Sequence, residues 1–174
     1  MMRVLMETAF LIPSTGGVYI LYERGKIYIG FSLDLKRRVL ESIQERRFES
    51  TVKIFCWTLP YDCNLEKKDD LEIFLRVLEH ETITAMHTII YGNALERQFG
   101  LHIINDVYAN DSAQLLPASA CDEGNHYFDL PIEIVQTFLK DIGVPEPLTG
   151  LPYYPLLLHP DFPKMSKLFG HPDR

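Results

Sequence analysis

The sequence predicts a mixed α/β fold in which short strands and helices alternate. Two β-rich runs, residues 17–22 and 26–31, flank a glycine-containing turn, which is typical of a β-hairpin. A helical pattern follows over residues 34–47, and a third β-rich run covers residues 51–59, where Pro60 ends it. This order indicates an α+β domain with a three-stranded antiparallel sheet flanked by helices.

The helix expected over residues 34–47 begins with a capping signal. Ser32 is the expected N-cap, and Asp34 suits the positive end of the helix dipole. Its apolar residues recur at i, i+4 and i+8, as Leu35, Val39 and Ile43. One face of this helix is therefore expected to pack on the sheet.

A longer helix is expected over residues 69–90, after a polar loop. Gly92 would break it, a further helical turn would cover residues 94–99, and a short apolar run follows at 101–104. These elements complete an expected domain of residues 1–108.

Residues 109–174 differ in composition from the domain that precedes them. Residues 109–127 are expected to form a loop, and residues 131–141 a helix with Pro131 in its first turn and Gly143 beyond its end. From Val144 onward the chain is rich in proline and should be extended, yet it is too apolar for a disordered linker. We expect this tail to pack on the domain or on a protein partner.

Charge and composition limit the function classes. The chain has 174 residues, three cysteines and a net charge of -7, and no apolar run approaches a membrane span or the core of a signal peptide. A cytoplasmic protein without a disulfide framework is expected. Such acidity argues against charge-driven, non-specific binding of nucleic acid. Residues 1–50, however, carry 8 basic and 6 acidic side chains. Either the acidic remainder simply keeps the protein soluble, or any anion-binding site belongs to these first fifty residues.

The candidate chemistry lies in the hairpin and the helix after it. Tyr19 and Tyr28 each lie in a strand that also carries a glycine, and Lys26 shares the strand face of Tyr28. Arg37 and Arg38 follow on the helix, where a guanidinium group offers two donors to a phosphate. A tyrosine flanked by cations would have its phenolate favoured and would accept a proton.

These residues resemble the signature of the GIY-YIG nuclease superfamily. Gly17-Val18-Tyr19 resembles the motif on the family's first strand, and Tyr28-Ile29-Gly30 resembles the motif on its second. Arg38 lies eight positions after the last glycine, where the family has its catalytic arginine. The dense part of the match runs from Gly17 to Arg38 and includes Ser32. The resemblance implies that Gly30, Ser32 and Arg37 contribute to nucleic-acid binding.

The family also has a metal-binding glutamate on a later helix, often followed by an asparagine. Glu79 fits best because Leu78 precedes it and Ile83 follows four residues later, and Glu81 is the alternative. Asn93 and Asn105 both qualify as the asparagine, and the sequence does not decide between them.

The resemblance implies a metal-dependent endonuclease that hydrolyses DNA phosphodiester bonds. Glu79 would hold one Mg²⁺ or Mn²⁺, Tyr19 would act as general base or position the attacking water, Tyr28 would orient that water or the arginine, and Arg38 and Lys26 would stabilise charge on the phosphate. A free-standing phage, mobile-element, defence or restriction-type nuclease is expected. The alternative is a non-catalytic module of the same fold whose acidic tail docks a protein.

Overall fold

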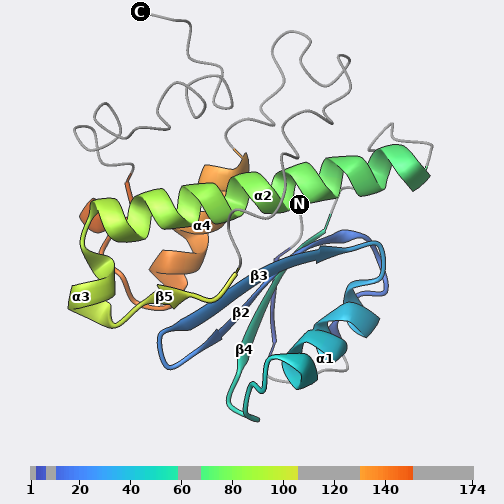
Figure 1. Ribbon diagram of the computed structural model, residues 1–174, viewed down its shortest axis with the longest axis horizontal. Coiled ribbons are helices and arrows are strands. Elements are labelled where there is room, and N and C mark those ends of the chain that lie inside the picture. Colours follow the sequence, from blue (N-terminus) through green and yellow to red (C-terminus); the bar gives the residue numbers. More distant parts are fainter. Residues whose placement is uncertain (1–2, 7–10, 59–67, 106–129, 151–174) are drawn as a thin grey trace, which may run out of the picture. The chain divides into compact units, whose positions relative to one another are not determined.

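The computed structural model describes residues 3–6, 11–58, 68–105 and 130–150, which form a mixed α/β structure (Figure 1). Its five-stranded sheet has the order β1-β4-β2-β3-β5. In chain order the strands are β1 (Arg3–Met6), β2 (Gly17–Glu23), β3 (Lys26–Ser32), β4 (Lys53–Thr58) and β5 (His102–Ile103). The three predicted strands form its centre, all antiparallel.

The prediction of a three-stranded sheet was incomplete, because one more strand lies at each edge. β1 pairs antiparallel with β4, and β5 pairs parallel with β3. β5 has only two residues, so it shows no alternation of its own. Its pairing depends on two backbone hydrogen bonds, from His102 N to Gly25 O and from Ile104 N to Ile27 O, both 2.9 Å.

The hairpin has a two-residue turn, and its register brings key residues opposite each other. Arg24 and Gly25 both have positive φ, 48° and 88°, which matches the twist of the flanking strands. Glu23 therefore pairs with Lys26, and further along the same ladder Tyr19 pairs with Gly30.

Helix α1 (Leu35–Glu45) is capped by Asp34, so the prediction of Ser32 as N-cap was wrong. The Asp34 carboxylate accepts from Arg37 N at 3.2 Å. The Ser32 hydroxyl instead closes the preceding turn, donating to Asp34 O and accepting from Asp34 N. Both residue types favour caps, and only the backbone shows which one precedes the first helical residue.

The C-terminal end of α1 is a left-handed cap with an arginine where glycine is usual. Arg47 has φ 53°, and its N–H donates to Gln44 O. Phe48 N donates to Ile43 O at 3.0 Å, and both side chains belong to the core. This cap ends the helix at Glu45 rather than at Arg47 and fixes the position of Arg46.

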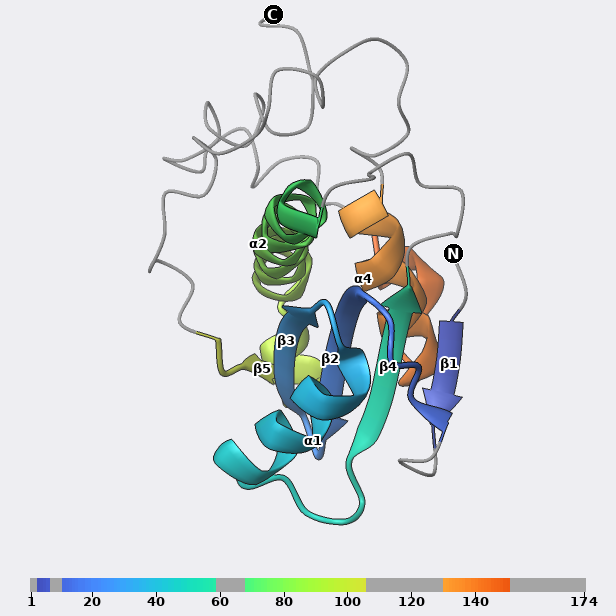
Figure 2. The same cartoon turned by 90° about the vertical axis from the view of Figure 1, so that its right-hand side faces the viewer.

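One side of the sheet carries the core that α1 covers (Figure 2). Tyr19 and Leu21 of β2, Tyr28 of β3 and Cys56 of β4 are buried, together with Leu35 and Val39 of α1. These residues alternate along their strands, as expected for one face of a sheet. The apolar spacing of α1 therefore did predict the face that packs, and it also determines which α1 side chains lie over the tyrosines.

The chain divides into two compact units, and helix α2 (Lys68–Gly92) contributes to both. Unit 1 comprises Met1–Glu79 and His102–Asp106, and unit 2 comprises His80–Leu101 and Val107–Arg174. Unit 2 contains α3 (Leu95–Phe99), α4 (Leu130–Asp141) and the 3-10 helix η5 (Glu146–Leu148). The predicted helices are confirmed, with α2 running through to Gly92.

Several predictions for the C-terminal region lie outside the described residues. These are the boundary at residues 108–109, the loop at 109–127 and the tail beyond Gly150. Within the described part, Glu146–Leu148 forms a 3-10 turn, so the chain after Val144 is not extended throughout. No helix of the described residues is long and apolar enough to cross a membrane.

Candidate active site

Tyr19 of β2 lies directly across the ladder from Gly30 of β3. Its side chain has no exposed surface, and a Cβ atom at Gly30 would overlap the Tyr19 phenol. Gly30, predicted to contribute to nucleic-acid binding, therefore has a packing role in the structure. Only glycine at this position leaves room for the Tyr19 ring.

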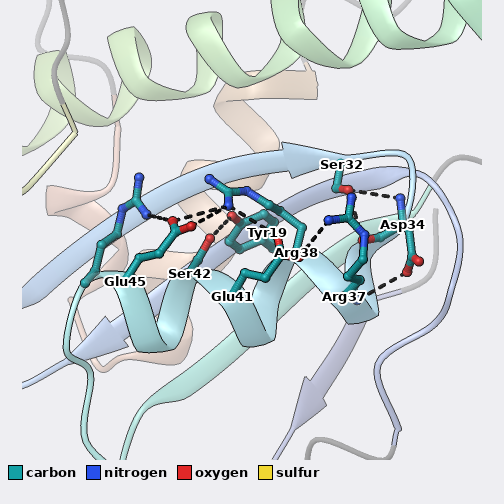
Figure 3. Close-up of polar contacts among 9 residues, drawn as sticks. Tyr19, Ser32, Asp34, Arg37, Arg38, Glu41, Ser42 and Glu45 are labelled. Atoms are coloured by element: carbon teal, nitrogen blue, oxygen red, sulfur yellow. Dashed lines mark hydrogen bonds and ion pairs between the residues drawn. The ribbon is translucent and has the colours of Figure 1, made fainter.

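The Tyr19 hydroxyl forms a 2.7 Å hydrogen bond with Ser42 Oγ, in which either atom can donate (Figure 3). Burial raises the pKa of Tyr19, and the opposing effects of Ser42, Arg38 and Arg46 do not offset it. The expectation that neighbouring cations favour the phenolate was therefore wrong, because desolvation outweighs their charge. Tyr19 keeps its proton at neutral pH.

Tyr28 lies beside Tyr19 and beneath a guanidinium group. The two phenol rings have centroids 6.1 Å apart and are tilted by 52°. The guanidinium carbon of Arg46 lies 3.7 Å from the centre of the Tyr28 ring, a cation–π contact. Burial raises the pKa of Tyr28, Arg46 lowers it and the nearby Glu79 raises it further. Arg38, Arg46 and Glu79 therefore all affect the pKa of Tyr28.

Arg38 projects from α1 above Tyr19 and is paired with two carboxylates (Figure 3). Its Nη1 lies 3.4 Å from Glu41 and 3.2 Å from both Glu45 oxygens. Glu45 also accepts from Arg46 Nη1 at 2.9 Å. The predicted catalytic arginine is thus present beside both tyrosines, with its charge balanced by residues of its own helix.

Glu79 is the acidic residue of α2 whose pKa these arginines affect. Burial raises its pKa to about 7, and Arg38, Arg76 and Arg46 oppose that rise. Glu81, the alternative, lies in unit 2, and burial alone raises its pKa to about 7. Glu79 therefore shares the electrostatic environment of Arg38 and Tyr28, as its helical position predicts.

Lys26 contacts the chain segment that ends α1. Its ammonium donates to Arg46 O at 2.7 Å and lies 4.2 Å from the centre of the Phe48 ring. Lys26 therefore holds the helix end that carries Arg46, and its contact with a phosphate stays a prediction.

The remaining predicted residues have partners of their own. Arg37 is exposed and forms an ion pair with Glu41 at 2.7 Å. The Asn105 side chain accepts from Ile29 N at 2.8 Å and donates to Ile29 O, so it continues the edge of β3 in unit 1. Asn93 donates to Ile89 O and Gly150 O within unit 2. Of the two asparagines, Asn105 therefore belongs to the unit that contains the tyrosines.

Sequence reasoning missed Arg46 and Ser42. Ser42 follows Arg38 by four residues on α1, and Arg46 is the C-cap of this helix. Ser42 bonds to Tyr19 and Arg46 lies over Tyr28, contacts that the apolar spacing of the helix does not indicate. We call Tyr19, Tyr28, Arg38, Arg46 and Glu79 the Tyr–Arg cluster.

The cluster offers one carboxylate to a metal ion. Within the described ranges, no group of three or more histidine, cysteine or acidic side chains is placed to hold a metal. A single carboxylate fits Mg²⁺, which keeps several waters and takes other ligands from substrate phosphate. The partly desolvated Glu79 carboxyl, with its raised pKa, is a group whose ionised form a cation would stabilise.

Comparisons with protein-family models, curated proteins and solved structures find no match to this chain. Any function assigned to this chain therefore depends on its own residues and their geometry.

Proposed function

We propose that this chain is a metal-dependent endonuclease of the GIY-YIG type that hydrolyses DNA phosphodiester bonds. One observation carries the proposal. Four residues chosen from the sequence (Tyr19, Tyr28, Arg38 and Glu79) come from a hairpin, α1 and α2, and they interact within unit 1. Phosphodiester hydrolysis requires positive charge that stabilises the phosphate and a carboxylate that holds a metal ion. These four residues meet both requirements.

Arg38 and Tyr28 are the groups that act on the substrate. The Arg38 guanidinium binds non-bridging phosphate oxygens and stabilises the charge that develops there in the transition state. Tyr28 as a whole residue is 7% exposed, and its pKa is affected by Glu79. Its hydroxyl orients the attacking water. Tyr19 has no exposed surface and a raised pKa, so it positions Tyr28 and Ser42 rather than removing a proton.

Glu79 is the residue that would hold Mg²⁺ or Mn²⁺. When bound, such an ion polarises the scissile phosphate and lowers the pKa of a coordinated water. Because the pKa of Glu79 is about 7, the carboxyl is half protonated at neutral pH in the absence of a cation. Activity should therefore increase with pH through this range.

The nicking of supercoiled plasmid in Mg²⁺ or Mn²⁺ tests the proposal. The wild type should nick the plasmid and leave ends that DNA ligase reseals, because the expected products are 5′-phosphate and 3′-hydroxyl. Arg38→Ala should lose the activity. Arg97→Ala, which removes an exposed arginine from unit 2, is the matched control and should keep it. A wild type that cuts neither double- nor single-stranded DNA would overturn the enzyme proposal in favour of a non-catalytic module.

A further inference from the structure

One carboxylate oxygen joins the two arginines of the Tyr–Arg cluster. Glu45 Oε2 lies 3.2 Å from Arg38 Nη1 and 2.9 Å from Arg46 Nη1. Arg38 lies in the first turn of α1 and Arg46 is the residue that ends this helix, yet both guanidinium groups reach the same Glu45 oxygen. An anionic oxygen at that point accepts from both.

Two contacts that do not use the guanidinium hydrogen-bond donors fix the position of Arg46. Its guanidinium carbon lies 3.7 Å from the centre of the Tyr28 ring, and its backbone carbonyl accepts a hydrogen bond from the Lys26 ammonium. The left-handed cap at Arg47 orients the same residue. Stacking uses the flat face of a guanidinium group, whereas hydrogen bonds use its edge, so both contacts are compatible.

Glu45 is the replaceable member of this arrangement. Its side chain is 52% exposed, whereas the Arg38 and Arg46 side chains are 30% and 28% exposed. Both arginines lower the pKa of Glu45, the hydrogen bond from Arg46 having the largest effect, so it is ionised at neutral pH. A phosphate oxygen accepts the same guanidinium hydrogen bonds as a carboxylate oxygen.

We propose that Arg46 is a second phosphate-binding residue beside Arg38, and that Glu45 is an internal carboxylate which the substrate phosphate displaces. This inference rests on the proposed nuclease function of the same cluster. In the free protein, Glu45 neutralises the arginines and keeps both side chains oriented. A polyanion must compete with it, so weakly held anions are excluded while a well-fitted phosphodiester is bound.

Binding without cleavage tests this proposal. The anisotropy of a short fluorescein-labelled DNA duplex is measured in EDTA with wild type, Glu45→Gln and the control Glu49→Gln. Glu49 pairs with Arg24 at 3.3 Å, so its variant makes the same charge change away from the cluster. Glu45→Gln should tighten binding about fivefold, and Glu49→Gln should change it less than about twofold.

Two further variants show whether Arg46 carries the effect. Arg46→Gln should weaken binding about tenfold, and Glu45→Gln added to Arg46→Gln should recover less than about twofold of it. Equal binding by Glu45→Gln and Glu49→Gln would overturn the proposal, as would an unchanged affinity in Arg46→Gln.

A second probe separates this proposal from the nuclease function. Pyrophosphate binding is measured by calorimetry with the same variants. Tighter binding of pyrophosphate by Glu45→Gln alone, together with a wild type that does not cut DNA, would support the two-arginine anion site and remove the nuclease. Cleavage by the wild type without any selective effect of Glu45→Gln on either probe would do the reverse.

Discussion

Glu79 and Glu81 lie two residues apart on α2, and their surroundings differ. Burial raises the pKa of each to about 7. For Glu79, three arginines oppose that rise, whereas burial alone accounts for the value of Glu81. Glu79 belongs to unit 1 with both tyrosines, and Glu81 belongs to unit 2.

The comparison shows that a perturbed pKa does not by itself identify a functional group. The pKa of each carboxyl is raised to about 7, and the two differ only because arginines oppose the rise for Glu79. The proposed function assigns phosphate chemistry to Glu79, whose pKa arginines affect and which itself raises the pKa of Tyr28, and no role to Glu81, which is only desolvated.

The largest expected difference is in activity. Glu79→Gln should reduce plasmid nicking at least about a hundredfold, because it removes the one carboxylate that would hold the metal. Glu81→Gln, the matched control on the same helix, should stay within about threefold of wild type. Initial nicking rates in Mg²⁺ measure both, and equal losses in the two variants would remove the distinction between these carboxyls.

The second difference concerns the glycine beneath Tyr19. Gly30→Ala should destabilise the fold by about 2 kcal/mol, because the added methyl group overlaps the Tyr19 phenol and both strands must shift. Gly150→Ala adds the same group where none of the described residues lies within 4 Å, so its urea midpoint should stay close to that of wild type. Similar midpoints for Gly30→Ala and Gly150→Ala would show that the ring does not need this space.

The third difference lies in the pH dependence of stability. Both carboxyls have a folded pKa of about 7, above the ordinary value of 4.5, so the folded chain binds more protons between these pH values. Stability should fall as pH rises through this window, by at most about 1.4 kcal/mol per pH unit for each carboxyl at 25 °C. Urea unfolding at a series of pH values measures the slope, which Glu79→Gln and Glu81→Gln should each reduce.

Magnesium should distinguish the contribution of Glu79 to stability from that of Glu81. Above pH 7, MgCl2 should stabilise the wild type and Glu81→Gln, because in the proposed function the ion would bind the ionised Glu79 of the folded chain. Glu79→Gln should gain no stability. A thermal shift of Glu79→Gln as large as that of wild type would place the ion elsewhere.

The smallest effect is expected from the hydroxyl of Tyr19. Tyr19→Phe should cost about 1 kcal/mol of unfolding free energy, because it removes the hydrogen bond to the buried Ser42. If Tyr19, with its raised pKa, only positions its neighbours, as proposed, the pH profile of nicking should keep its shape in Tyr19→Phe. A lost pH limb in this variant would restore Tyr19 as the general base.

Local signals in the sequence were enough for the centre of the sheet and for α1. The Arg24-Gly25 turn, the alternation of the strands and the spacing of Leu35 and Val39 each depend on neighbouring residues. The outer strands were not predictable in this way, because β5 is two residues long and exists only through hydrogen bonds to β3.

The candidate site was predictable where a motif fixes the spacing. Tyr19, Tyr28, Arg38 and Glu79 were chosen from such spacing, and the structure gives each an interaction with another of them. The hydrogen bonds of Lys26 and Asn105 could not be predicted, because they go to backbone groups distant in sequence. Arg46 was missed because its contact with Tyr28 is tertiary.

The most direct test of the account is single-turnover cleavage of a labelled DNA duplex in Mg²⁺ by the wild type, Arg38→Ala, Glu79→Gln and the double variant. If the two residues serve one site, each single variant loses most of the activity and the double variant is hardly slower than either. Losses that multiply in the double variant, or a wild type that leaves the duplex intact, would contradict the account.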